Sequence, residues 1–262
     1  MPPNDAAAIS ARGLVRRFGS QVAVSGVDLD VGWGEVYGFL GPNGAGKTTT
    51  LRMLCGLLSP SAGQVLVAGA DVVHDPLAAK RHIGYLDEQP FLYQQLTGRE
   101  FVDFVAALYE VPSEQRAPRA ERLLEALDLT ERQHDLIAGY SQGMRQRIGL
   151  ASLLVHDPDV LFLDEPTNGL DPRSARLVKD LIESLARQGK AVVLSTHILE
   201  IAQALCRRIG IMEDGRIVAE GTMAELRALA GASEANLEDL FLNLTATPGD
   251  EAAAWLAEGG VA

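Results

Sequence analysis

The sequence predicts an α/β fold with a mostly parallel sheet, a flanking antiparallel β subdomain and an inserted helical subdomain. Unbroken apolar runs at 36–40, 160–163 and 191–194 are typical of strands buried on both faces of a parallel sheet. Residues 41–48, GPNGAGKT, fit G-x-x-x-x-G-K-[ST], the phosphate-binding loop that joins a strand to a helix. From 96 to 155 apolar residues recur at helical spacing, which predicts a helical insertion of about 60 residues in the α/β core.

The composition bounds the class of protein. The 262 residues are 47% apolar, which is enough for a sizeable core. No apolar run reaches the length of about 18 residues that suggests a membrane-spanning helix, and the N-terminus does not read as a secretory signal. The net charge of −12 argues against a nucleic-acid partner. Cys55 and Cys206 lack metal-site or disulfide spacing and are expected to be buried thiols, so the sequence predicts a soluble, acidic, cytoplasmic protein.

The first part of the chain predicts a small antiparallel sheet beside the core. Residues 1–8 read as a loose terminus. Short apolar segments alternate with polar ones from 9 to 31, around a turn at Gly19 and Ser20. Residues 64–69 read as a further strand of this sheet.

The phosphate-binding loop is followed by a helix and a connector. Leucines at helical spacing predict the helix over 48–57. Residues 77–95 read as a connector that leaves the core through a short strand at 82–86.

The helical insertion begins with a capping box at 97–100. Pro112 and Pro118 are expected to bracket the loop between its first two helices. The three helical stretches are 101–109, 120–127 and 142–155.

The strand at 160–163 returns the chain to the core. Gly189 is expected to stop the helix that follows this strand, and Asp214-Gly215 to form the turn of a hairpin. The remaining elements are expected to be a helix at 173–188, a strand at 191–194, a hairpin of 208–212 with 217–219 and an amphipathic helix around 237–244. Residues 1–245 are expected to form a single nucleotide-binding domain, with 246–262 as a flexible tail.

The phosphate-binding loop carries the first chemistry. Its glycines let consecutive N–H groups point at one anion, and the helix N-terminus adds partial positive charge. Lys47 can reach the β- and γ-phosphates, where it assists catalysis, and the Thr48 hydroxyl can bind Mg²⁺. The residues expected to bind the nucleotide here are Gly41, Pro42, Asn43, Gly44, Ala45, Gly46, Lys47, Thr48 and Thr49.

A pair of acidic residues ends the strand at 160–163. Asp164 can hold Mg²⁺ through water, as phosphate-loop enzymes require. Glu165 can point at the γ-phosphate and polarise an attacking water as a general base. The alternative is an acidic pair that caps the following helix.

Three further motifs carry a resemblance to a known family. Residues 140–147, YSQGMRQR, resemble the LSGGQ signature of ATP-binding cassette (ABC) proteins. Residues 166–171, PTNGLD, resemble that family's D-loop, and 195–197, STH, its switch histidine. All the motifs occur in the family's order over residues 9–225. The resemblance implies a P-loop NTPase core of the RecA-like type.

The resemblance also implies a composite site. In this family two cassettes pair head to tail, and each ATP contacts the phosphate loop of one copy and the signature of the other. Ser141, Gln142 and Gly143 would then bind the partner's nucleotide from a helix N-terminus. His197 would contact the γ-phosphate, unless it is an ordinary histidine at a strand end, and Asp171 would link the two sites across the interface.

Phe18 matches the aromatic position that stacks on adenine in the family. The alternative is that Phe18 is an ordinary core residue.

Two parts of the sequence depart from the family pattern. The signature has Tyr140, Gln142 and Met144 where Leu, Gly and Gln are commonest, and Met144 cannot hydrogen-bond a ribose. The connector, usually a GYLPQ-like run, reads GYLDEQ at 84–89, so that Glu88 stands at the expected position and Gln89 next to it.

The acidic connector leaves two assignments open. Either Glu88 or Gln89 could reach Mg²⁺ and the attacking water, and the spacing favours Glu88. Asp87 replaces the usual proline, which predicts a looser connector.

These variants resemble a subgroup of the family. Residues 84–89, 96–100, 140–145 and 236–244 look like the bacterial drug-export type, which includes daunorubicin- and sodium-exporter cassettes whose permeases are separate chains. The resemblance implies an ATP-binding and ATP-hydrolysing subunit with ATP and Mg²⁺ as cofactors. It would act as a homodimer on integral membrane permease subunits, peripheral to the inner face of the cell membrane.

The segment 88–99 is the expected place for permease docking, between the core and the helical insertion. Phe91, Leu92 and Tyr93 are apolar residues suited to receive a permease helix. The alternative is that they are ordinary packing residues.

Two other functions remain to be weighed. A cassette ATPase that drives assembly or regulation without transport would share these motifs, although such proteins tend to carry two cassettes or a long coiled coil. A switch GTPase should show an N-K-x-D base-reading motif, which the sequence lacks, and a kinase would have no use for 140–147.

Overall fold

The computed structural model describes residues 7–229. A six-stranded sheet lies at its centre, and its strands are β3 (Val36–Leu40), β6 (Ile83–Leu86), β7 (Val160–Asp164), β8 (Ala191–Thr196), β9 (Arg208–Glu213) and β10 (Arg216–Gly221). The order across the sheet is β10-β9-β3-β8-β7-β6, and all neighbouring pairs are parallel except the β9–β10 hairpin. The predicted parallel sheet and hairpin are therefore confirmed.

The central strands are apolar throughout because both of their faces are covered. In β7, Leu161 and Leu163 pack into the core on one face of the sheet, while Val160 and Phe162 pack into the core on the other face. This alternation follows from the two-residue period of a strand. A continuous apolar run is what such a strand requires.

A second, antiparallel sheet flanks the first. It consists of β1 (Ile9–Phe18), β2 (Gln21–Val31), β4 (Ala62–Val67) and β5 (Ala70–Asp71), in the order β2-β1-β4-β5. Helix α1 (Lys47–Leu54) contacts both sheets and buries Leu51 and Leu54 in the core between them. The predicted antiparallel subdomain is confirmed.

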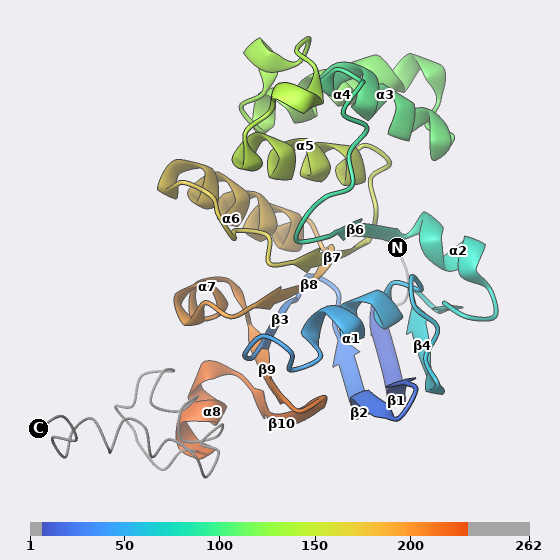
Figure 1. Cartoon of the computed structure of the whole chain (residues 1–262), viewed down its shortest axis with the longest axis vertical. Helices are drawn as coiled ribbons and strands as arrows, with labels where there is room; N and C mark the ends of the chain where they lie inside the picture. Colours follow the sequence, from blue (N-terminus) through green and yellow to red (C-terminus); the bar gives the residue numbers. More distant parts are fainter. Residues whose placement is uncertain (1–6, 230–262) are drawn as a thin grey trace, which may run out of the picture.

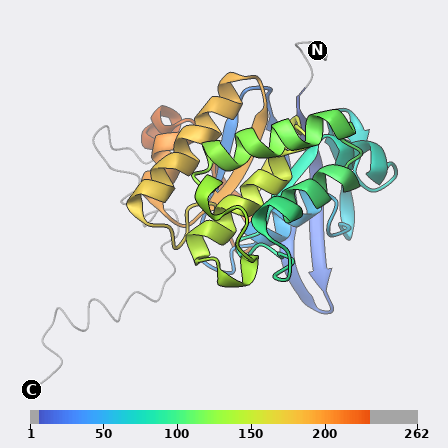
Figure 2. The ribbon, with the colours of Figure 1, turned by 90° about the horizontal axis from the view of Figure 1, so that it is seen from above.

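The other helices are α2 (Pro76–Arg81), α3 (Gly98–Leu108), α4 (Ser113–Ala126), α5 (Gln142–Leu154), α6 (Pro172–Arg187), α7 (Leu199–Leu205) and α8 (Met223–Leu229). Helices α3, α4 and α5 lie at the opposite end of the molecule from β1, β2 and β4 (Figure 1). Viewed from above, α3 to α6 lie over the sheet (Figure 2). The capping box predicted at 97–100 is present, with the Thr97 and Glu100 side chains each bonded to the backbone N–H of the other.

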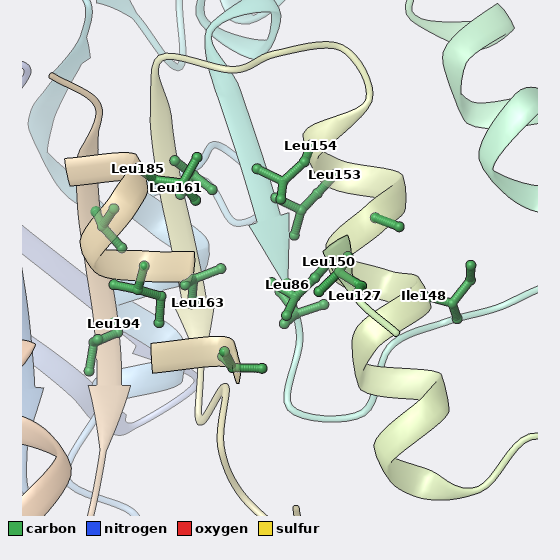
Figure 3. Packing of buried hydrophobic residues seen from close by; sticks show 14 of the residues in the cluster. Leu86, Leu127, Ile148, Leu150, Leu153, Leu154, Leu161, Leu163, Leu185 and Leu194 are labelled. Atoms are coloured by element: carbon green, nitrogen blue, oxygen red, sulfur yellow. The ribbon is translucent and has the colours of Figure 1, made fainter. Parts of the chain in front are cut away.

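Leucines join the helical insertion to the sheet. Leu150, Leu153 and Leu154 of α5 face Leu86 of β6 and Leu161 of β7 (Figure 3). The insertion therefore shares one apolar core with the sheet. This packing holds α5 in position against β6 and β7.

Two predictions of detail were wrong, and three short helices were missed. Pro118 lies inside α4 rather than in a loop, because it is exposed there and the carbonyl of residue 114, which loses its intrahelical donor, is also near the surface. Helix α1 ends at Leu54 rather than at residue 57, because Gly56 adopts a left-handed φ of 70°. The short helices α2, α7 and α8 were not predicted.

Several predictions fall outside the described residues, namely the final helix around 237–244 and the tail 246–262. Cys55 and Cys206 are buried as expected, and burial raises the pKa of each thiol to about 12. Among residues 7–229, none of the helices has the length and apolar character needed to cross a bilayer.

Candidate functional site

The phosphate-binding loop lies between β3 and α1, as predicted. Gly44 and Gly46 have φ values of 87° and 99°, which only glycine adopts without strain. A Cβ at Gly46 would also lie 2.7 Å from the carbonyl oxygen of Ala23. Helix α1 starts at Lys47, so the loop ends at a helix N-terminus, where free N–H groups favour an anion.

Lys47 is buried at the bottom of the loop. Its Nζ donates to the carbonyl oxygens of Gly41 at 2.7 Å and Pro42 at 3.0 Å, and lies 4.0 Å from Glu165 Oε1. Burial lowers the pKa of Lys47, and the nearby carboxylate of Glu165 opposes that shift. The Lys47 amine is thus held in place by two backbone carbonyl groups of its own loop.

Asp164 is the last residue of β7 and Glu165 follows it, at the carboxyl edge of the sheet. Ser195 of β8 pairs with Asp164 in the strand register, and its hydroxyl contacts both acidic residues. Ser195 Oγ donates to Asp164 Oδ1 at 2.5 Å and accepts from the backbone N–H of Glu165 at 3.0 Å. Ser195 therefore fixes the acidic pair, a role that the sequence did not reveal.

The Asp164 carboxylate is nearly inaccessible. Its Oδ2 is buried and has no hydrogen-bond partner in the described structure. Burial raises the pKa of Asp164, although the hydrogen bond from Ser195 and the nearby Thr48 hydroxyl oppose the shift. A buried carboxylate oxygen with a free lone pair suits a cation ligand better than a helix cap.

Glu165 and His197 face each other at the ends of β7 and β8. His197 Nδ1 and Glu165 Oε1 share a hydrogen bond of 2.9 Å. Glu165 is buried, whereas His197 is exposed to solvent. The pair places a carboxylate and an imidazole at one wall of an open cleft.

This nucleotide cleft has a volume of about 710 Å³. The predicted residues that line it are Phe18, Asn43, Gly44, Gly46, Lys47, Thr48, Thr49, Glu88, Glu165 and His197. Phe18 is 47% exposed, so the alternative that it is a core residue is wrong. Gly41 and Ala45 are buried within the loop, and Pro42 is exposed beside it.

Of the two connector residues, only Glu88 reaches the nucleotide cleft, and both line a second hollow. Glu88 lines the nucleotide cleft, and its Oε1 accepts a hydrogen bond of 3.0 Å from Asn168 Nδ2. Gln89 lines only the second hollow, of about 520 Å³, together with Glu88, Phe91 and Leu92. The geometry therefore brings Glu88, and not Gln89, to the phosphate loop.

The structure shows what Asp87 contacts in the place of the usual proline. Asp87 accepts hydrogen bonds from Arg52 Nη2 at 2.9 Å and from the Tyr85 hydroxyl at 3.0 Å. Its side chain thus anchors the segment from which a proline is missing.

The signature-like residues lie away from the nucleotide cleft. Ser141 is the N-cap of α5 and accepts from the backbone N–H of Met144, and Ser141 and Gln142 are exposed. Tyr140 is buried, and its hydroxyl donates to the carbonyl of Arg132 at 2.7 Å, which explains how a tyrosine fits where leucine is commonest. The predicted helix N-terminus is confirmed.

Asp171 also lies outside the cleft. It caps α6, accepting from the N–H groups of Arg173 and Ser174 and from the Ser174 hydroxyl, contacts that lower the pKa of its carboxyl. Within one copy of the chain, therefore, Asp171 has a structural role.

Sequence reasoning missed part of the cleft wall. The additional lining residues are Gln21, Val22, Ala23, Asn168, Asp214 and Gly215. Asp214-Gly215 had been assigned only as a hairpin turn, but the Gly215 N–H donates to the carbonyl of Ala45 at 3.1 Å and so braces the loop. Since Asn168 lies within 166–171, that motif was the one available signal.

Comparison with known proteins agrees with this geometry. Residues 24–168, more than half of the chain, match the family model described as ABC transporter. The chain is 44% identical over 224 residues to the daunorubicin resistance ATP-binding protein DrrA3 of Streptomyces coeruleorubidus, which covers 86% of this chain and 71% of that protein. It is 41% identical over 221 residues to a fluoroquinolones export ATP-binding protein of Mycobacterium tuberculosis, covering 84% of this chain and 72% of that protein.

Solved structures show the same fold. One, described as the structure of the ATP binding subunit of an ABC transporter, has a TM-score of 0.85 and 30% identity, and the match covers 90% of this chain and 99% of the other. Another is cbiO1 from Clostridium perfringens, part of the ABC transporter complex cbiONQ, with a TM-score of 0.75 and 26% identity over 86% of this chain and 92% of the other. With its phosphate loop, acidic pair and family match, this chain belongs to the ABC transporter family, as an ATP-binding subunit that hydrolyses ATP and pairs with membrane permease subunits.

Proposed function

We propose that two copies of this chain close head to tail around two ATP molecules. The observation that carries the proposal is the separation of the two halves of the site. Lys47 and Thr48 line the cleft, whereas Ser141 and Gln142 are exposed at the N-terminus of α5, outside it. A second copy could bring that helix N-terminus to the open side of the cleft and supply the missing phosphate contacts.

We propose that Mg²⁺ accompanies the nucleotide. The unpartnered Oδ2 of Asp164 and the Thr48 hydroxyl supply hard oxygen ligands, which Mg²⁺ prefers. Glu88 is the connector residue placed to contact the ion or its water. When bound, the ion would neutralise charge on the β- and γ-phosphates.

For hydrolysis, Glu165 is proposed to orient and deprotonate the attacking water. Its carboxylate is buried at the cleft wall and held by His197 at 2.9 Å, which fixes the direction in which it can accept a proton. Lys47 stabilises the charge that develops on the transferred phosphoryl group. Phe18, at the cleft mouth, is proposed to stack on the adenine.

The proposed cargo is a small organic molecule such as a drug, moved out of the cell. This proposal is supported by relatives named for daunorubicin resistance and for fluoroquinolone export. For this export function, we propose that the chain lies at the inner face of the cell membrane, docked on its permease subunits.

The test uses the Glu165→Gln variant, which keeps the shape of the base but removes its charge. We expect it to bind MgATP and to shift from monomer to dimer on light scattering, while hydrolysis falls by about 100-fold or more. The additional substitution Lys47→Ala is the control, and it should abolish the shift because the phosphate loop no longer holds ATP.

Two results would contradict the proposal. Hydrolysis by Glu165→Gln at the wild-type rate would remove Glu165 from the mechanism. A variant that binds MgATP yet stays monomeric would exclude a dimer that closes without help from the permease.

A further inference from the structure

Three side chains meet between the end of α1 and the connector. Asp87 Oδ2 accepts from Arg52 Nη2 at 2.9 Å and from the Tyr85 hydroxyl at 3.0 Å. Arg52 Nε in turn donates to the Tyr85 oxygen at 3.4 Å. Burial raises the pKa of Tyr85, so its phenol keeps the proton that it donates to Asp87. We name these three residues the connector clamp.

The connector clamp joins two parts of the nucleotide cleft. Arg52 lies in the last turn of α1, the helix that starts at Lys47 in the phosphate loop. Asp87 immediately precedes Glu88, which lines the cleft. Asp87 Oδ1 also accepts from the backbone N–H of Gln89 at 3.4 Å, so that the backbone is held on both sides of Glu88.

The local result is that Glu88, but not Gln89, lines the nucleotide cleft. Glu88 points into the cleft and is met there by the Asn168 amide at 3.0 Å. Glu88 also lines the neighbouring hollow, whereas Gln89 lines only that hollow. A proline at position 87 could restrict the backbone, but it could neither bind Arg52 nor accept from the N–H of residue 89.

We propose that Asp87 is a positioning residue that keeps Glu88 in register with the phosphate loop, through Arg52 and Tyr85. The proposal rests on the role proposed above for Glu88 toward MgATP. Arg52 also offsets the negative charge that Asp87 adds beside a site for phosphates. The alternative is that Arg52 and Asp87 form a surface ion pair that contributes only to stability.

The experiment compares Asp87→Ala and Asp87→Asn, each with and without Glu88→Ala. Asp30→Ala is the matched control, because Asp30 pairs with Arg12 at 2.6 Å on the antiparallel sheet, in a partly exposed ion pair that does not line the cleft. Two quantities are measured on the full chain. One is kcat and KM for ATP hydrolysis, and the other is the factor by which Mg²⁺ tightens ATP binding at equilibrium.

We expect Asp87→Ala to lower kcat by about 10-fold, as loss of a supporting residue behind a ligand usually does, with KM changed less than about 2-fold. The Mg²⁺ factor should fall in parallel with that of Glu88→Ala. In the Glu88→Ala background, Asp87→Ala should have no further effect on either quantity, since Asp87 acts through Glu88. Asp87→Asn should recover part of the activity, because its amide oxygen can still accept from Arg52 and Tyr85, although its NH2 group cannot accept from the N–H of Gln89.

Each contrary outcome has a distinct meaning. If Glu88→Ala lowers both quantities but Asp87→Ala does not, or if the Asp87 effect persists in the Glu88→Ala background, the positioning proposal is wrong and the site assignment stands. If Glu88→Ala changes neither quantity, the connector role itself fails, and the positioning proposal fails with it. The Mg²⁺ factor is a binding measurement, so it decides between these outcomes even for a chain that hydrolyses ATP slowly.

Discussion

Glu165 occupies a backbone conformation that few side chains accept. Its φ of 46° lies in the left-handed region, where a residue with a Cβ is strained by roughly 1–3 kcal/mol. The Ser195 hydroxyl accepts its N–H, and the same hydroxyl donates to Asp164. The turn after β7 therefore contains a strained backbone conformation, which sets the direction in which the Glu165 carboxylate points.

At the same scale, Asp164 should weaken the metal-free protein. Burial raises the pKa of its carboxyl, which means that the folded chain disfavours the ionised form. We expect Asp164→Asn to raise the free energy of unfolding by about 1 kcal/mol at neutral pH in EDTA, while hydrolysis is lost. The gain should vanish well below pH 4, where the carboxyl is protonated in both the folded and the unfolded chain, grow as pH rises from there, and level off above the folded-state pKa.

Urea unfolding at a series of pH values measures this difference. Asp30→Asn is the control of opposite sign, because Arg12 lowers the pKa of Asp30 and its ionised form is favoured in the folded chain. An Asp164→Asn variant less stable than wild type at neutral pH would mean that the hydrogen bond from Ser195 to the carboxylate outweighs the cost of burial.

At the scale of elements, α4 contains an internal weakness. Pro118 cannot donate to the carbonyl of residue 114, so one intrahelical hydrogen bond is missing in the first half of this helix. The helix persists because Ala120 and Leu124 are buried against the rest of the insertion. Tertiary packing here overrides a local signal that otherwise predicts a loop.

We therefore expect Pro118→Ala to stabilise the chain by roughly 1 kcal/mol, the regained bond being partly offset by a more flexible unfolded state. Hydrolysis should be unchanged, because α4 does not line the cleft. The midpoint of urea unfolding gives the comparison. Pro112→Ala is the matched control and should not stabilise, because Pro112 is the N-cap, where no intrahelical N–H is needed. Equal gains at both positions would refute this explanation.

The sequence predicted those elements whose burial leaves a continuous or periodic apolar pattern. β3, β7 and β8 were found because both of their faces are covered, and α3 because its capping box is local. Helices α2 and α7 were missed because each has too few residues to show a period.

The site divides in the same way. Lys47, Asp164 and Glu165 were predicted because their chemistry lies within short motifs. The cleft wall at Ala23 and Gly215 was missed because these residues contact the loop through backbone atoms. Such contacts do not depend on the type of side chain and leave no pattern in the sequence. The anchoring of Asp87 was missed for a related reason, since its partner Arg52 is distant in sequence.

At the scale of the whole molecule, the hollow next to the connector lies between the sheet and the helical insertion. Phe91 is 88% exposed there, and its ring lies edge-on to Tyr93, which in turn packs against Phe104 of α3. The alternative of ordinary packing is thus wrong for Phe91. Because Glu88 lines both this hollow and the nucleotide cleft, we propose that Phe91 receives a membrane subunit here.

We accordingly expect Phe91→Glu to weaken assembly with the membrane subunits by about 10-fold or more, as loss of an aromatic anchor does. The isolated chain should keep its melting temperature and its affinity for MgATP, because the side chain is exposed. Leu77→Glu is the matched control, since Leu77 is 75% exposed on α2, away from this hollow. Reconstitution with purified membrane subunits tests this, and assembly by Phe91→Glu at wild-type strength would move the docking surface elsewhere.

The two buried cysteines have a practical consequence for experiments on motion. Both cysteines of the chain lie among the described residues, and with thiol pKa values of about 12 they are almost wholly protonated at neutral pH. A maleimide or a thiol-reactive spin label should therefore react little with the two native cysteines, and should react with a cysteine introduced at a chosen exposed position. Distances between two labelled copies could then be measured through a catalytic cycle without first replacing the two native cysteines.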